Sequence, residues 1–183
     1  MFIKASHRGN WGWTLVEMMF ATGIFGIGIA AVMTIFAFSL KGFTAMSNYG
    51  ILDIENRQAM DTLTRELRQA QAVTGISTNP PTLSLLNSSG ATVVYSFNPT
   101  AMVMTRSVNG TQSVLLTNCS LLNFLLYQRN PSNASYGIYP IASSNWSNTV
   151  KVVELTWKTS RGIGGTGRVN SENVQTARIV IRN

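Results

Sequence analysis

The residues of this chain that could do chemistry are few, and they lie far apart in the sequence. The only histidine, His7, and the only cysteine, Cys119, stand in different halves of the 183 residues. After Gly75 the acidic residues are Glu154 and Glu172 alone. A Ser-His-Asp triad, a Cys-His pair or a histidine-based metal cluster needs a histidine, and none follows the N-terminal segment. The sequence therefore predicts no catalytic site, no metal site and no cofactor.

Glu17 is the acidic residue whose position most needs a reason, because an apolar segment follows it directly. From Met18 to Leu40, a run of 23 residues, the sequence carries no charge. At the helical rise such a run spans about 34 Å, which is enough to cross a ~30 Å hydrocarbon core. A carboxylate carried to the centre of a bilayer costs about 2.5 to 3.5 kcal/mol. We therefore expect either a positive partner for Glu17, or a position among lipid headgroups at a helix N-terminus, where the helix dipole favours an anion.

The length and composition indicate one domain with an appended segment. The hydrophobic share of 45% is ordinary for a globular domain with one membrane segment, and the net charge is +7. Beyond Gly75 eight Lys or Arg residues face two acidic ones, which gives 8 − 2 = +6. These cations are dispersed, which is typical of a solvated surface, although such a surface could also meet phosphate or an acidic partner. Cys119 lies within an apolar stretch and is expected to be a small buried residue.

A single long helix is predicted from about Trp13 to Thr74. No proline occurs before Pro80, so no residue in this range lacks a backbone donor. Beyond Lys41 the apolar residues recur at steps of three and four on one side of the helix, as Met60, Leu63, Leu67 and Ala70 do. Gly75, followed by "STNPP", provides a stop signal. The first half should therefore sit in a membrane, and the second half should pack on a domain.

After Pro81 the periodicity changes to two. The segments "TLSLL", "TVVYSF", "AMVMTR", "QSVLLT", "LLNFLLY", "VKVVELTWK" and "ARIVIRN" are predicted to be strands. Val153, Leu155 and Trp157 would share the buried face of one of them. "RGIGGTGR" and "NPSNASYGIYPIASSNWSN" are predicted to be loops. The expected fold class is α+β: a long N-terminal helix, with a membrane-spanning first half, packed on a mostly antiparallel β-sheet.

The basic start of the chain, with Lys4 and Arg8 before the apolar run, indicates a targeting leader. Cleavage near the end of the apolar run, at Ala37-Phe38-Ser39, would discard the segment that continues into the amphipathic helix. Cleavage before the run, after Gly12, would leave the helix whole and attached to its domain.

The residues from Gly12 to Glu17 read "GWTLVE", and they precede "MMFATGIFG". This segment resembles the N-terminus of the type IV prepilin superfamily, whose leaders end in glycine and whose mature chains begin with an aromatic residue, a short Thr-Leu-Val stretch and glutamate. The resemblance implies that a membrane prepilin peptidase cleaves after Gly12 and methylates the new amine of Trp13. It also implies that Glu17 pairs with the N-terminal amine of a neighbouring subunit. The chain departs from the family in having Trp13 where phenylalanine is usual, and in lacking a proline within the apolar helix.

The resemblance divides the chain into four parts. Residues 1–12 would be a leader that is removed, 13–40 a transmembrane and filament-core helix, 41–74 the amphipathic half of that helix, and 75–183 a β-rich globular pilin domain. The first half of the helix would pack against other subunits through Leu15, Phe20, Ile24, Ile27 and Met33.

More loosely, the remainder resembles the larger minor pilins and the J-type minor pseudopilins of type II secretion, in "MDTLTRELRQA", "LLNFLLY" and the closing "ARIVIRN". This implies a structural minor subunit of a type IV pilus or of a type II secretion pseudopilus, and no enzyme. Its partners would be other pilins or pseudopilins through their N-terminal helices, the prepilin peptidase and an inner-membrane assembly platform. The protein would be a single-pass protein of the bacterial inner membrane before assembly, and part of a periplasmic pseudopilus or a surface pilus afterwards.

Three alternatives stay open on the sequence. The chain could be a major pilin, although it lacks the pair of C-terminal cysteines that many major pilins carry. It could be a pilus subunit that captures DNA, because its C-terminal part is basic. An enzyme with one membrane anchor is the third alternative, and Glu154 and Glu172 would then have to meet in space.

Overall fold

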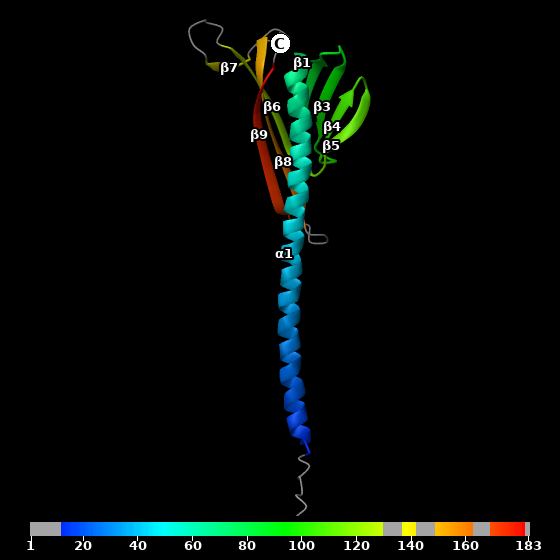
Figure 1. Ribbon diagram of the computed structural model, residues 1–183, viewed down its shortest axis with the longest axis vertical. Helices are drawn as coiled ribbons and strands as arrows, with labels where there is room; N and C mark the ends of the chain where they lie inside the picture. The colour runs from blue at the N-terminus through cyan, green and yellow to red at the C-terminus, as the bar shows by residue number, and fades with distance from the viewer. Residues whose placement is uncertain (1–11, 130–136, 142–148, 163–168, 182–183) are drawn as a thin grey trace, which may run out of the picture. The chain divides into compact units, whose positions relative to one another are not determined.

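The structure, a computed structural model, describes residues 12–129, 137–141, 149–162 and 169–181 (Figure 1). Most of the predicted leader, and parts of the two predicted loops, lie outside these residues. The chain forms two compact units, Met1–Phe43 and Thr44–Asn183. Its elements follow in the order α1 (Leu15–Gln69), β1 (Ala70–Thr78), β2 (Pro81–Asn87), β3 (Thr92–Asn98), β4 (Val103–Val108), β5 (Thr111–Leu116), β6 (Cys119–Arg129), β7 (Ile138–Pro140), β8 (Val150–Gly162) and β9 (Val169–Val180).

The first unit is the apolar part of helix α1. The helix begins at Leu15, close to the predicted start, and it contains a segment long and apolar enough to cross a membrane. None of that segment is buried inside the structure. The prediction of a long apolar N-terminal helix is confirmed.

Helix α1 ends at Gln69, five residues before the predicted end at Thr74. From Ala70 onward the chain forms strand β1, in which Ala72 and Val73 pair with Leu86 and Leu85 of β2. The glycine at position 75, which the sequence analysis took as a helix stop, lies inside this strand and pairs with Ser84. The correction has a physical reason: hydrogen bonding to the following strand, β2, outweighs the weak local preference of "AQAVT" for helix.

The first sheet contains β1 to β5 in sequence order, and every pair is antiparallel. Strands β3 and β4 form a hairpin, and the side chain of Asn98 closes its turn by accepting hydrogen bonds from the amides of Thr100 and Ala101, both at 3.0 Å. The turn between β4 and β5 contains Asn109 and Gly110, whose φ angles of 48° and 88° fit the left-handed turns that favour this residue pair.

The second sheet has the order β7-β6-β8-β9 and is also antiparallel throughout. Val153, Leu155 and Trp157 of β8 are fully buried on one face, as the alternating pattern predicts. Strand β7 is a correction, because the sequence analysis assigned its residues to a loop.

The predicted sheet is therefore two sheets, which Figure 1 shows on either side of the upper part of helix α1. The helix presents one buried stripe to them, formed by Leu52, Asn56, Ala59, Leu63 and Leu67. Both sheets turn apolar side chains toward this stripe and share one hydrophobic core with it. The α+β fold class, with a long N-terminal helix packed on antiparallel sheets, is confirmed.

Candidate functional site

The N-terminal turn of helix α1 holds Glu17 in a reciprocal hydrogen-bonded cap. The backbone N–H of Glu17 donates to Oγ1 of Thr14 at 3.2 Å. In return, Oε2 of Glu17 accepts from the backbone N–H of Thr14 at 3.0 Å and from its hydroxyl at 3.1 Å. This is a capping box, in which two otherwise unpaired amides at a helix N-terminus gain partners.

This cap was not among the expectations for Glu17, which were a partner charge or the helix dipole. The signal was present, because a threonine followed three residues later by glutamate, just before an apolar run, is the sequence form of this motif. Both hydrogen bonds end on Oε2 of Glu17. The other carboxylate oxygen, Oε1, is therefore the atom through which Glu17 could bind a further donor.

Gly12 and Trp13, the two residues of the predicted cleavage site, lie immediately before this cap. Both precede the first helical residue, Leu15, and both are exposed, Trp13 to 73%. An exposed peptide bond outside regular structure can reach the active site of a protease. A cut after Gly12 would leave Trp13 as the new N-terminus, one residue before Thr14 and its cap.

The five residues predicted to pack against other subunits are all exposed, between 62% and 77%. Phe20, Ile24 and Ile27 follow one another at steps of four and three, so they form one stripe along the helix. Leu15 and Met33 are 18 residues apart, which is five full turns, and they lie about 140° around the helix from Phe20. The predicted residues therefore mark two sides of the helix.

The two threonine hydroxyls inside the apolar segment find their partners within the helix itself. The hydroxyl of Thr22 donates to the carbonyls of Met18 and Met19 at 2.9 and 3.0 Å, and that of Thr34 donates to the carbonyl of Ala30 at 2.8 Å. In hydrocarbon an unpaired hydroxyl would be costly, so these bonds adapt the segment to apolar surroundings. Large apolar side chains are exposed all along it, including Phe25, Val32 and Phe36. Such a helix needs lipid or other apolar helices around it.

In the second unit Glu154 and Glu172, which an enzyme would have to bring together, lie in separate ion pairs. Glu154 accepts a hydrogen bond from Nε of Arg178 at 2.7 Å, and Glu172 binds Nζ of Lys158 at 2.8 Å. Each carboxylate thus neutralises a cation on the neighbouring strand, which stabilises the pairing of β8 with β9. Among the described residues, no group of three or more His, Cys, Asp or Glu side chains could hold a metal ion.

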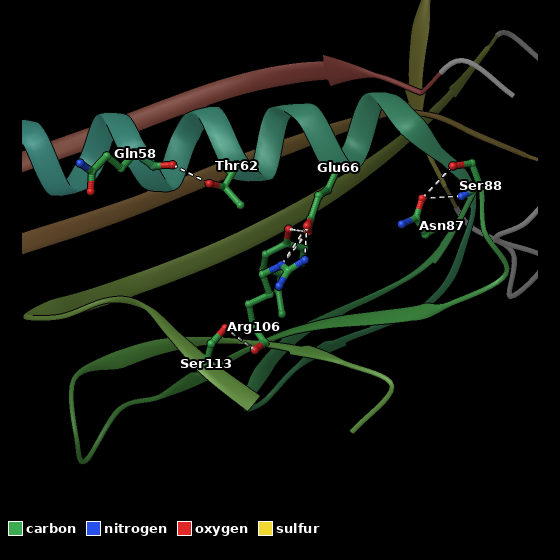
Figure 2. Close-up of polar contacts among 8 residues, drawn as sticks. Gln58, Thr62, Glu66, Asn87, Ser88, Arg106 and Ser113 are labelled. Atoms are coloured by element: carbon green, nitrogen blue, oxygen red, sulfur yellow. Dashed lines mark hydrogen bonds and ion pairs between the residues drawn. The ribbon is translucent and has the colours of Figure 1, made fainter. Parts of the chain in front are cut away.

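A third ion pair joins helix α1 to the first sheet, where Figure 2 shows Arg106 extending from the sheet toward Glu66. Nε of Arg106 lies 2.9 and 3.0 Å from the two oxygens of Glu66, its terminal nitrogen Nη2 also donates to this carboxylate, and the hydroxyl of Tyr95 donates to it as well. Burial raises the pKa of Tyr95, and the carboxylate of Glu66 raises this pKa further. Together with the pairs above, this contact places three of the eight basic side chains after Gly75 in ion pairs.

Cys119 is fully buried and forms no disulfide, as its apolar surroundings predict. Its thiol donates to the carbonyl of Leu121 at 3.2 Å. Burial raises the pKa of the thiol to about 11, so the reactive thiolate is scarce at neutral pH. The arrangement is that of a core residue.

No protein-family model, no curated protein and no solved structure significantly matches this chain.

Proposed function

We propose that the protein is a structural subunit of a type IV pilus or of a type II secretion pseudopilus, processed after Gly12 and assembled through the first half of helix α1. The observation that carries the proposal is the combination at the N-terminus. The residues "GWTLVE" lead into the first turn of a helix whose first half is apolar on all sides and exposed, and the same helix continues into the core of a folded domain.

The exposed apolar half of the helix would have one environment before assembly and another afterwards. Before assembly it would span the inner membrane, with Lys4 and Arg8 on the cytoplasmic side, as cations flanking a span usually are. After assembly its stripes, including Phe20, Ile24 and Ile27, would pack against the helices of other subunits. In both environments the side chains find apolar neighbours, and the internal hydrogen bonds of Thr22 and Thr34 remain intact.

Glu17 would act at assembly. Cleavage creates an ammonium group at Trp13, and a charge of this kind among apolar helices needs an opposite partner. Oε1 of Glu17 in a neighbouring subunit would supply that partner while Oε2 keeps its own cap. The prepilin peptidase and an inner-membrane assembly platform would be the other partners of the N-terminal segment.

The decisive experiment is mass spectrometry of sheared surface filaments and of the membrane fraction from the native cell, reading both the abundance of the protein and its N-terminal peptide. A peptide that begins at methylated Trp13, from a trace component of the filaments, supports a minor pilin. The same peptide from the dominant component would make the protein a major pilin. If the protein stays in the membrane but begins at Trp13, a pseudopilin is supported, and an intact N-terminus at Met1 in all fractions would contradict the proposal.

A further inference from the structure

The outer edge of strand β9 is the longest unprotected strand edge in the described part of the chain. Strand β9 pairs with β8 on one side, and no described strand pairs with its other side (Figure 1). Exposed edges are usually protected by shortness, proline, lysine or bulges. Of the other sheet edges, β7 has three residues and ends at Pro140, β5 has six residues, and β1 contains two register shifts. Strand β9 has 12 residues without proline or lysine, and it pairs regularly with β8 from Ser171 to Val180.

The backbone groups on this edge can be assigned from the ladder with β8. The N–H of Ile181, the residue after β9, donates to the carbonyl of Lys151 at 3.0 Å. In an antiparallel ladder the residues alternate between those that bond to the neighbour and those that face away. The even-numbered residues of β9, namely Glu172, Val174, Thr176, Arg178 and Val180, therefore direct their N–H and C=O groups to the open edge.

The side chains of these residues carry a pattern of charge. They lie on the exposed face of the second sheet, with Val174 59% and Val180 58% exposed. Glu172 is bound to Lys158 through Oε1, and Arg178 is bound to Glu154 through Nε. Both charges stay partly exposed in their ion pairs, Glu172 to 50% and Arg178 to 66%, so an added strand could bring a charge of opposite sign to each of them.

We propose that the open edge of β9 binds an extended segment of a partner protein, antiparallel to β9, with a basic residue opposite Glu172 and an acidic residue opposite Arg178. A basic residue of the added segment would extend the ion pair of Lys158 with Glu172. An acidic residue would extend the ion pair of Glu154 with Arg178. Backbone hydrogen bonds to the even-numbered residues would supply affinity, and the two charges would fix direction and register.

A second copy of β9 would satisfy the same charges, but its direction argues against it. Strand β9 runs in the direction of helix α1, because Ser171 bonds to the carbonyl of Ala45 while Gln175, further along, pairs with Trp157, which bonds to Asn56. Two β9 strands paired antiparallel would therefore direct their helices oppositely. Subunits that repeat along one filament all point the same way, so this choice of occupant rests on the proposed function.

The test uses the full chain in detergent micelles and a fluorescent synthetic peptide with the sequence of residues 171–180, "SENVQTARIV". Paired antiparallel about Gln175, this peptide places its own arginine opposite Glu172 and its own glutamate opposite Arg178. The control peptide carries Glu172→Arg and Arg178→Glu, which keeps the composition and sets like charges opposite each other. We expect the first peptide to bind about tenfold more tightly than the control, by fluorescence anisotropy.

A matched pair of variants tests the backbone contact. Thr176→Pro removes an N–H that faces the open edge and leaves the hydrogen bonds to β8 in place, because proline is tolerated at that position of an edge strand. Both variants lose the hydrogen bond between the hydroxyls of Thr176 and Thr156, which are 3.1 Å apart. Thr176→Ala loses only this contact and keeps the N–H. Binding should be lost in the first variant and kept in the second. If Thr176→Pro does not fold, a peptide N-methylated at its own Thr176 makes the same test on the native chain.

Three results would overturn the proposal. They are equal affinity for the two peptides, no binding of the first peptide up to about 1 mM, or equal binding to the Thr176→Pro and Thr176→Ala variants. A dimer of the full chain that Thr176→Pro dissolves would show that the occupant is a second copy, and would overturn the choice of partner.

Discussion

The indole N–H of Trp157 donates a hydrogen bond to Oδ1 of Asn56 at 2.6 Å, and both residues are fully buried. The amide nitrogen of Asn56 donates in turn to the hydroxyl of Thr159 at 2.8 Å. One side chain of helix α1 thereby joins two positions of strand β8 inside an otherwise apolar core. Because a buried polar group needs its partners, this contact favours one rotation and one height of the helix against the second sheet.

Replacing this amide should be costly. Asn56→Ala leaves the indole N–H of Trp157 without its acceptor and opens a small cavity, so we expect a loss of about 2 to 4 kcal/mol in the free energy of unfolding. Chemical denaturation of the full chain in detergent, followed by tryptophan fluorescence, measures it. Gln58→Ala, on the exposed side of the same helix, is the control and should change stability by no more than about 0.5 kcal/mol. Equal effects of the two substitutions would contradict the role of Asn56.

The stability of the folded domain should fall at alkaline pH because of Tyr95. Burial, and then the carboxylate of Glu66, raise the pKa of this phenol above its unfolded value of about 10. Since the folded pKa is the higher one, the contribution is complete below about pH 10, and it is lost as the pH rises further, by up to about 1.4 kcal/mol per pH unit. Denaturation midpoints between pH 9 and 12 should therefore fall less steeply in Tyr95→Phe than in the native chain. Parallel curves would show that Tyr95 does not contribute.

Cys119 should react slowly in the folded protein. Its thiol is buried and its pKa is about 11, so iodoacetamide at pH 8 meets little thiolate and little access. We expect alkylation to be at least about a hundredfold faster after unfolding in guanidinium chloride, as read by intact-mass spectrometry. Rapid labelling of the native protein would mean that this part of the core opens easily.

Two substitutions of Glu17 can separate its role in the helix cap from its role in docking to a neighbouring subunit. Glutamine at this position can still accept hydrogen bonds from Thr14, because Gln serves in a capping box, but it carries no charge. If Glu17 pairs with the amine of Trp13 in a neighbouring subunit, both Glu17→Gln and Glu17→Val should lose filament assembly while cleavage after Gly12 continues. Immunoblots of sheared filaments and of the processed chain measure the two steps. Normal assembly in Glu17→Gln with loss in Glu17→Val would assign Glu17 to the cap alone.

Thr14→Val is the complementary substitution. It removes the hydroxyl that accepts from the amide of Glu17 and leaves the carboxylate charged. We expect it to weaken the first helical turn by about 1 kcal/mol, with assembly reduced less than in Glu17→Gln. Thr14→Ser should restore the cap, and circular dichroism of a peptide covering residues 13–43 in micelles would report the difference.

Local chemistry in the sequence determined the long helix and most of the strands. The apolar run from Met18 to Leu40 contains no proline and no charge that would interrupt a helix. Strand β8 alternates so regularly that the buried face of Val153, Leu155 and Trp157 could be predicted residue by residue. The capping box of Thr14 and Glu17 was equally local and could have been read from four residues.

The tertiary structure alone decided where the helix ends, how the strands divide and which polar groups meet. "AQAVT" becomes strand because β2 offers it hydrogen bonds, and the strands form two sheets that both pack on the one buried stripe of helix α1. The partners of Asn56 and Glu66 lie about 100 and 40 residues away in the chain. A sequence pattern records the preference of each segment for an apolar side, whereas the choice among distant partners depends on packing that only the complete fold provides.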